Sequence, residues 1–217
     1  MLFEFCCLPK FSKNNIDKNV IYKGEIPEKE LINREYSKFF LSAHFANWEF
    51  QAYCFPLLFK DFLNIIVKTQ SNIILDKKIN KFREFSGNKM IAMGVSLREV
   101  YQKIMANEIV CFLIDQSAHS EYSVYVNFFG KKVSCFAGSS KLALKYRPKL
   151  IFAYVIRDNN YKYTILTEEI FYDDLQGTSE ENIIILTQRI QSKLEDVVKK
   201  YPEQWLWFHR RFKYIKN

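Results

Sequence analysis

Short apolar runs alternate with longer amphipathic segments along the chain. Runs rich in Val, Ile and Phe predict buried strands, and segments with helical spacing or helix-capping residues predict helices. The expected strands are residues 20–22, 39–43, 64–68, 110–114, 124–129, 150–156 and 161–167. The expected helices are residues 27–36, 47–58, a segment ending near residue 85, 96–106, 138–146 and 179–201. This alternation predicts an α/β fold with a mostly parallel central sheet flanked by helices, to which 150–156 and 161–167 add an antiparallel hairpin.

Single residues refine these boundaries. Ser96 followed by Glu99 forms a capping box at the start of the helix 96–106. Pro56 disturbs the end of the helix 47–58, and Gly130 turns the chain after the alternating run 124–129. No internal repeat or low-complexity linker divides the chain, so residues 1–217 are expected to form a single domain.

The composition indicates a globular protein with a basic surface. Of 217 residues, 48% are hydrophobic and 26% charged, which excludes a disordered chain. Aromatic residues reach 17%, which fits either a Phe-rich core or pockets and surfaces that meet lipid. The net charge of +8 favours nucleic acid, an anionic membrane or an acidic carrier protein as partner, and is equally typical of a generic basic surface.

Several site types are not indicated. The five cysteines lack C-x-x-C spacing, and none of His44, His119 and His209 has a local cluster of ligands, so no metal is expected. The chain has no P-loop, G-x-G-x-x-G or G-x-S-x-G motif, and no apolar run long enough to span a membrane. Reduced cysteines indicate a cytosol-facing location.

The spacing H-x4-E places His44 and Glu49 directly after the expected strand 39–43. A histidine at the mouth of a strand can remove a proton from a hydroxyl near neutral pH. A carboxylate within reach can fix its tautomer and stabilise the imidazolium that forms. Such a pair suits direct transfer of an acyl group to an alcohol, although a His and a Glu also fall at this spacing by chance.

Asp115 and Gln116 follow the next strong strand candidate, residues 110–114. They could hydrogen-bond a substrate, or Asp115 could cap the next turn. Sites in open α/β sheets lie beyond the carboxyl ends of strands. His44 and Asp115 both occupy such a place, and we expect them to line one cleft.

Three further features have two readings each. Phe128-Phe129-Gly130 could wall an apolar channel or form a hairpin with a packed aromatic pair. Arg83 could bind an anion bidentately or be a solvated helix charge. The segment 202–211, PEQWLWFHRR, mixes aromatic and basic residues, which suits nucleic acid, a membrane interface or packing on the domain.

Taken together, these pieces resemble one family, the late acyltransferases of lipid A biosynthesis (lauroyl and myristoyl transferases). The matching elements, in the family's order, are SAHFANWE at 42–49, Asp115-Gln116, NFFG at 127–130, Leu142-Ala143-Leu144, Arg157 and PEQWLWFHRRFK at 202–213.

The resemblance implies a glycerolphosphate-acyltransferase-like fold and transfer of a fatty acyl chain from acyl carrier protein to a hydroxyl of a Kdo-bearing lipid A precursor, at the cytoplasmic face of the bacterial inner membrane. It assigns the general base to His44 and its orienting partner to Glu49. No metal or nucleotide cofactor is implied, and the basic surface would meet the carrier protein, the glycolipid and anionic lipid rather than nucleic acid. Expected substrate contacts are Asn47, Trp48, Arg83, Asp115, Gln116, Phe128, Phe129, Gly130, Arg157 and Arg210, with Arg211 as a further anion contact.

The chain also departs from the family pattern. Ala46 and Asn127 stand where Gly and Pro are usual, and the family's N-terminal hydrophobic anchor is not matched. We therefore expect an N-terminally truncated form that is peripheral to the membrane. The alternatives are an inactive truncated remnant, an acyltransferase for another glycolipid or a lysophospholipid, and a basic nucleic-acid-binding module.

Overall fold

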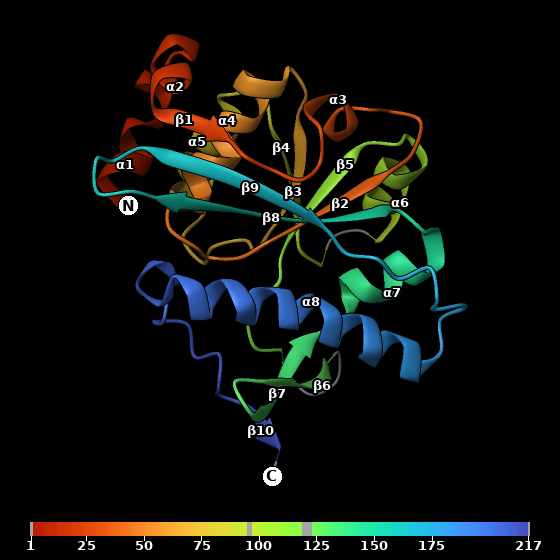
Figure 1. Ribbon diagram of the computed structural model, residues 1–217. Coiled ribbons are helices and arrows are strands. Elements are labelled where there is room, and N and C mark those ends of the chain that lie inside the picture. The colour runs from red at the N-terminus through yellow and green to blue at the C-terminus, as the bar shows by residue number, and fades with distance from the viewer. Residues whose placement is uncertain (1, 95–96, 119–122, 217) are drawn as a thin grey trace.

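A seven-stranded, mostly parallel sheet forms the centre of the protein (Figure 1). This computed structural model describes residues 2–94, 97–118 and 123–216. The strand order is β1-β9-β8-β2-β5-β3-β4, and every neighbouring pair is parallel except β8 with β9. The strands are β1 (Val20–Tyr22), β2 (Lys38–Ser42), β3 (Leu63–Val67), β4 (Lys89–Ala92), β5 (Ile109–Leu113), β8 (Lys149–Arg157) and β9 (Tyr163–Glu169). The predicted α/β fold is confirmed, and β8 and β9 form the predicted antiparallel pair.

Helices cover both faces of this sheet. On one face, Phe55 and Phe59 of α4 join a buried cluster with Phe40 and Ile65. On the opposite face, apolar side chains of α6, α7 and α8 pack against Phe39 and its neighbours in the largest core cluster. The helices are α1 (Leu2–Cys7), α2 (Lys13–Asn19), α3 (Glu28–Leu31), α4 (Trp48–Phe59), α5 (Ile73–Glu84), α6 (Leu97–Met105), α7 (Gly138–Tyr146) and α8 (Glu180–Lys200), with 3-10 helices η1 (Leu8–Lys10) and η3 (Pro202–Gln204).

A second, antiparallel sheet of three strands lies on the other side of α8 (Figure 1). Its order is β10-β7-β6, and its strands are β6 (Ser123–Phe128), β7 (Lys131–Phe136) and β10 (Ile215–Lys216). Phe129 and Gly130 join β6 to β7 with φ values of 50° and 70°. Two consecutive positive φ angles are typical of a tight hairpin turn, so the turn predicted at Gly130 is confirmed.

Helix α4 continues through Pro56 to Phe59, one residue beyond its predicted end. A proline inside a helix removes the hydrogen bond to the carbonyl four residues earlier, here that of Ala52. The side-chain amide of Asn88 donates to this carbonyl at 2.7 Å. The polar group that Pro56 leaves free is thus satisfied from outside the helix, which explains why α4 tolerates the proline.

Two other segments differ from the prediction. The helix expected at 27–36 is only the four-residue α3, because Asn33 Oδ1 accepts from the backbone N–H of Glu35 at 2.9 Å. Such a local bond offers the backbone an alternative to the helix. Strand β4 was not expected, and it is a short edge strand with a single buried residue, Ile91. The expected N-cap Ser96 lies outside the described residues.

Candidate active site

His44 and Asp115 follow two neighbouring parallel strands. Strand β2 ends at Ser42 and β5 ends at Leu113, and these two residues are register partners. Both strands therefore deliver the chain to the same edge of the sheet, and each functional residue comes two positions later. The two side chains are in direct contact, but of the two only His44 lines the cavity described below, so the expectation of one cleft lined by both is not met.

The Asp115 carboxylate is fully buried and holds the His44 side chain. Its Oδ1 lies 2.8 Å from Nδ1 of His44, while its Oδ2 accepts from the His44 backbone N–H at 3.0 Å and from Nε1–H of Trp205 at 3.1 Å. Burial alone would raise the pKa of Asp115, but the hydrogen bonds and charge of His44 and the Trp205 bond hold it below its usual value. An ionised Asp115 binds the proton-bearing Nδ1, which leaves Nε2 of His44 free to accept a proton.

Glu49 binds Arg83. Nε of Arg83 donates to Glu49 Oε2 at 2.9 Å and Nη2 donates to Oε1 at 2.5 Å, a bidentate pair between α4 and α5. The structure thus differs from the expectation that Glu49 orients His44, because the carboxylate hydrogen-bonded to the imidazole is that of Asp115. It also differs for Asp115, expected as a substrate contact, because both oxygens of that buried carboxylate are engaged by His44 and Trp205.

Two aromatic rings enclose the His44 imidazole. The Trp48 and His209 rings each make an edge-to-face contact with it, with ring centroids 4.7 Å and 4.3 Å from that of His44. Burial and the nearby His44 lower the pKa of His209, against the opposing effect of Asp115. Leu206 donates its backbone N–H to the His44 carbonyl at 2.9 Å, which fixes this C-terminal segment on the His44 loop. Sequence reasoning placed His209 in no site, since its only local signal was the mixed aromatic and basic segment.

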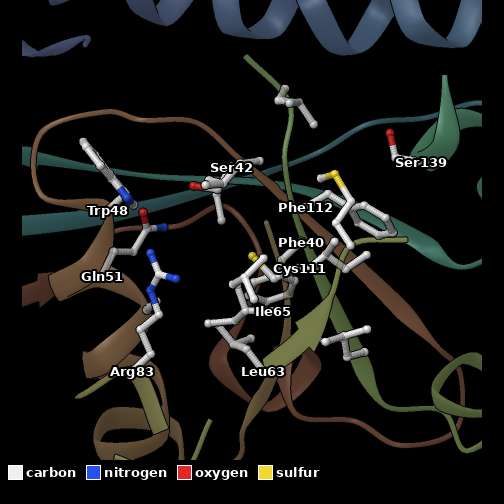
Figure 2. A pocket seen from close by; sticks show the side chains of 18 of the residues that line it. Phe40, Ser42, Trp48, Gln51, Leu63, Ile65, Arg83, Cys111, Phe112 and Ser139 are labelled. Carbon is white, nitrogen blue, oxygen red and sulfur yellow. The ribbon is translucent and has the colours of Figure 1, made fainter. Parts of the chain in front are cut away.

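His44 lines a mostly apolar cavity of about 780 Å³. Figure 2 shows Trp48, Gln51 and Arg83 on one side of this cavity and Phe112 and Ser139 on the other. Glu49 and the predicted Gln116 also line it. This volume is typical of small-molecule sites, and the apolar walls suit a long alkyl chain.

The contacts predicted at Phe128, Phe129 and Gly130 lie elsewhere. Phe128 is fully buried, and its ring packs against Phe129, Trp205 and Phe212. Neither Phe128, Phe129 nor Gly130 is among the described residues that line the cavity. Of the two interpretations of these residues, the hairpin with a packed aromatic pair is correct and the wall of an apolar channel is not.

Asn47 and Arg157 line a separate, polar cavity of about 390 Å³. Asn47 is the N-cap of α4 and accepts from the backbone N–H of Phe50 at 3.1 Å. The Arg157 guanidinium lies 5.3 Å from the centre of the Tyr161 ring. The structure therefore does not bring Asn47 and Arg157 to the lining of the His44 cavity.

Arg210 is exposed, whereas Arg211 is 1% exposed. The Arg211 guanidinium donates to the Ser134 carbonyl at 2.7 Å and to Gln191 Oε1 at 3.1 Å. This buried cation joins the C-terminal segment to β7 and α8, so Arg211 is not free to meet an anionic substrate. Trp205 is buried as well, which withdraws two residues of the segment from any surface partner.

Across the described part of the chain, no three His, Cys, Asp or Glu side chains gather as a metal site would require. Within the same residues, the helices are too short or too polar to cross a bilayer. His119, considered above as a possible ligand, lies outside the described residues.

A family model for bacterial lipid A biosynthesis acyltransferases matches residues 1–214. Comparison with curated proteins gives no match. The family match spans the His44 loop, Asp115 and the C-terminal segment that packs on them. The chain therefore belongs to the bacterial lipid A biosynthesis acyltransferases, and it is an acyltransferase.

Proposed function

We propose that this enzyme moves a fatty acyl chain from the thioester of acyl carrier protein to a hydroxyl of a Kdo-bearing lipid A precursor, with His44 as general base. The observation that carries the proposal is the buried His44–Asp115 hydrogen bond of 2.8 Å beside a large apolar cavity. A base held in one tautomer next to a space for an alkyl chain is the arrangement that direct acyl transfer requires.

In this mechanism, Nε2 of His44 accepts the proton of the acceptor hydroxyl as its oxygen attacks the thioester carbonyl carbon. The ionised Asp115 stabilises the imidazolium that forms. The tetrahedral intermediate then expels the carrier thiolate as the carbon–sulfur bond breaks. The thiolate takes the proton from His44, so the products are an ester and a free thiol, and the imidazole returns to its starting state.

The Glu49–Arg83 pair has a different part in this proposal. Arg83 lines the cavity, and Glu49 fixes its guanidinium through two parallel hydrogen bonds. A fixed cation near the reacting carbonyl favours the developing oxyanion or a phosphate of the glycolipid. Glu49 would then serve transfer through Arg83 rather than through His44.

Exposed apolar side chains in the cavity lining and at the start of α5 support work at an anionic membrane. Met93 and Leu97 line the cavity and are exposed, and Ile73 and Ile74 at the start of α5 are exposed too. Lys68 is exposed and lines the cavity, and its positive charge would attract anionic lipid. We place the enzyme at the cytoplasmic face of the inner membrane, where carrier protein and glycolipid meet.

The test uses the purified chain with labelled acyl carrier protein and a Kdo-lipid A precursor in detergent. The parent should form acylated glycolipid, and His44→Ala should lose at least 100-fold in rate, since a general base contributes about 10²- to 10⁴-fold. Equal melting temperatures would show that the variant is folded. No transfer by folded parent protein, or equal rates for both proteins, would refute the proposal.

A further inference from the structure

The cavity beside His44 is lined from both faces of the main sheet. Ile65 and Ile66 are consecutive residues of β3, and both line it; Cys111 and Phe112 of β5 do the same. Successive side chains of a strand point to opposite faces. The lining residues also divide between the two core clusters on the two faces. The cavity therefore passes around the carboxyl ends of these strands and has two arms.

The first arm lies between the sheet and α4, and we name it the α4 arm. It extends along β3 from Val67 at the carboxyl end to Leu63 at the start, a depth of roughly 13 Å at about 3.3 Å per residue. Trp48, whose ring contacts His44, lies on this side of the sheet at the start of α4. The α4 arm is lined by Phe40, Phe55, Phe59, Ile65 and Cys111.

The second arm lies on the opposite face, toward α6 and α7, and we name it the α7 arm. Its walls belong to the larger core cluster, and they are apolar. Gly138, the first residue of α7, lines this arm at an exposed position, and a Cβ built on it meets nothing within 4 Å. The α7 arm is lined by Ile66, Val100, Phe112, Gly138 and Leu142.

We propose that the α7 arm binds an alkyl chain of the acceptor lipid while the α4 arm binds the acyl chain of the donor. The proposal rests on the proposed function, in which acyl group and acceptor hydroxyl meet at His44 without a covalent enzyme intermediate. Both substrates must then be bound at once, and two chains leaving one reaction centre need two separate apolar spaces. The α4 arm, which begins beside the Trp48–His44 contact, suits the chain that carries the reacting carbonyl.

Binding of a free fatty acid tests the two arms without any requirement for activity. Equilibrium dialysis with radiolabelled dodecanoate, below its micellar concentration, should give two bound molecules per parent chain. Gly138→Phe fills the α7 arm and Ala52→Phe, also a cavity-lining position, fills the α4 arm, so each should leave one site. The exposed Ala106→Phe is the matched control and should keep two sites.

Steady-state kinetics then assigns the arms. Gly138→Phe should raise the KM for the acceptor about tenfold, equivalent to about 1.4 kcal/mol, and leave the KM for the acyl donor within about twofold. Ala52→Phe should do the reverse. If either Phe variant fails to fold by circular dichroism, the smaller Gly138→Leu and Ala52→Leu take its place.

One dodecanoate per parent chain, or loss of both sites in Gly138→Phe, would overturn the two-arm cavity. Equal effects of both substitutions on one substrate's KM would overturn the assignment of donor and acceptor. Two sites in a folded parent that shows no transfer would refute the proposed function and leave the two arms supported, so the two failures are distinct.

Discussion

Replacing Asp115 by asparagine removes a negative charge from a fully buried position and keeps the size of the side chain. The carboxylate accepts three hydrogen bonds, two from His44 and one from Trp205. Asparagine offers one acceptor oxygen and one NH2 donor group. The asparagine oxygen would accept from the two N–H groups that now donate to Oδ2 of Asp115, and the asparagine NH2 group would then face Nδ1 of His44. The imidazole must then carry its proton on Nε2, and that tautomer cannot accept a proton from the acceptor.

The main effect of Asp115→Asn should be on catalysis. The corresponding tautomer error in a serine-protease triad lowers kcat by about 10⁴. We expect a fall of about 10³- to 10⁴-fold, or roughly 4–5.5 kcal/mol of barrier. The effect on folding should be smaller, because asparagine keeps two of the hydrogen bonds and no longer buries a charge. A net loss of about 1–2 kcal/mol would lower the melting temperature by roughly 2–8 °C.

The assay measures kcat for acyl transfer at saturating donor and acceptor, with the melting temperature as a check on folding. Asp173→Asn is the matched control, because its side chain is 92% exposed. That control should keep the parent's kcat and melting temperature. A kcat for Asp115→Asn within tenfold of the parent would show that Asp115 does not set the His44 tautomer, and the orienting role would return to Glu49.

Four further predictions follow from the same contacts. The pKa of Asp115 is lower in the fold than in the unfolded chain, so its ionised form stabilises the protein above its ordinary pKa of about 3.9. This contribution is lost as pH falls through the folded pKa. In urea unfolding between pH 5 and 3, the free energy of unfolding should therefore fall more steeply in the parent than in Asp115→Asn. Glu49→Gln and Arg83→Lys should each lower kcat/KM about 10- to 100-fold, and a double-mutant cycle should show strong non-additivity, whereas additive effects would mean that the two act separately. Arg211→Met should lower the free energy of unfolding by roughly 3 kcal/mol in urea titrations, since its buried partners lose their donor, and an unchanged midpoint would refute that role. Asn88→Ala should cost about 2 kcal/mol of stability by leaving the carbonyl freed in α4 unsatisfied, with kcat of the folded enzyme unchanged.

The alternation of strands and helices could be predicted because each element carries its own local pattern. Apolar runs identified β2, β5 and β8, and the long amphipathic segment identified α8. The short α3 and the edge strand β4 have weaker patterns, and the end of α3 depends on the side-chain bond of Asn33. The end of α4 was mispredicted at Pro56 for a similar reason. The carbonyl that the proline leaves without a partner accepts from Asn88, 32 positions later in the chain than Pro56.

The site was harder to predict, because local spacing and spatial contact select different carboxylates. H-x4-E favours Glu49, which lies in the first turn of the helix that follows the His44 loop. The actual partner, Asp115, is 71 positions away and reaches His44 only because β2 and β5 are neighbours in the sheet. The sequence indicates that both residues follow strands, but strand order comes from long-range packing that no local pattern records.

The C-terminal segment depends on long-range packing in the same way, and it links the stability of the fold to the geometry around His44. Trp205 donates to the carboxylate that orients His44, and His209 packs on the imidazole itself. Two positions beyond His209, Arg211 fixes the segment to β7 and α8 through buried hydrogen bonds. A substitution at Arg211 should therefore loosen the surroundings of His44 although Arg211 is not among the described residues that line the cavity. Trp205, His209 and Arg211 of this aromatic and basic segment thus hold His44 and its surroundings in place.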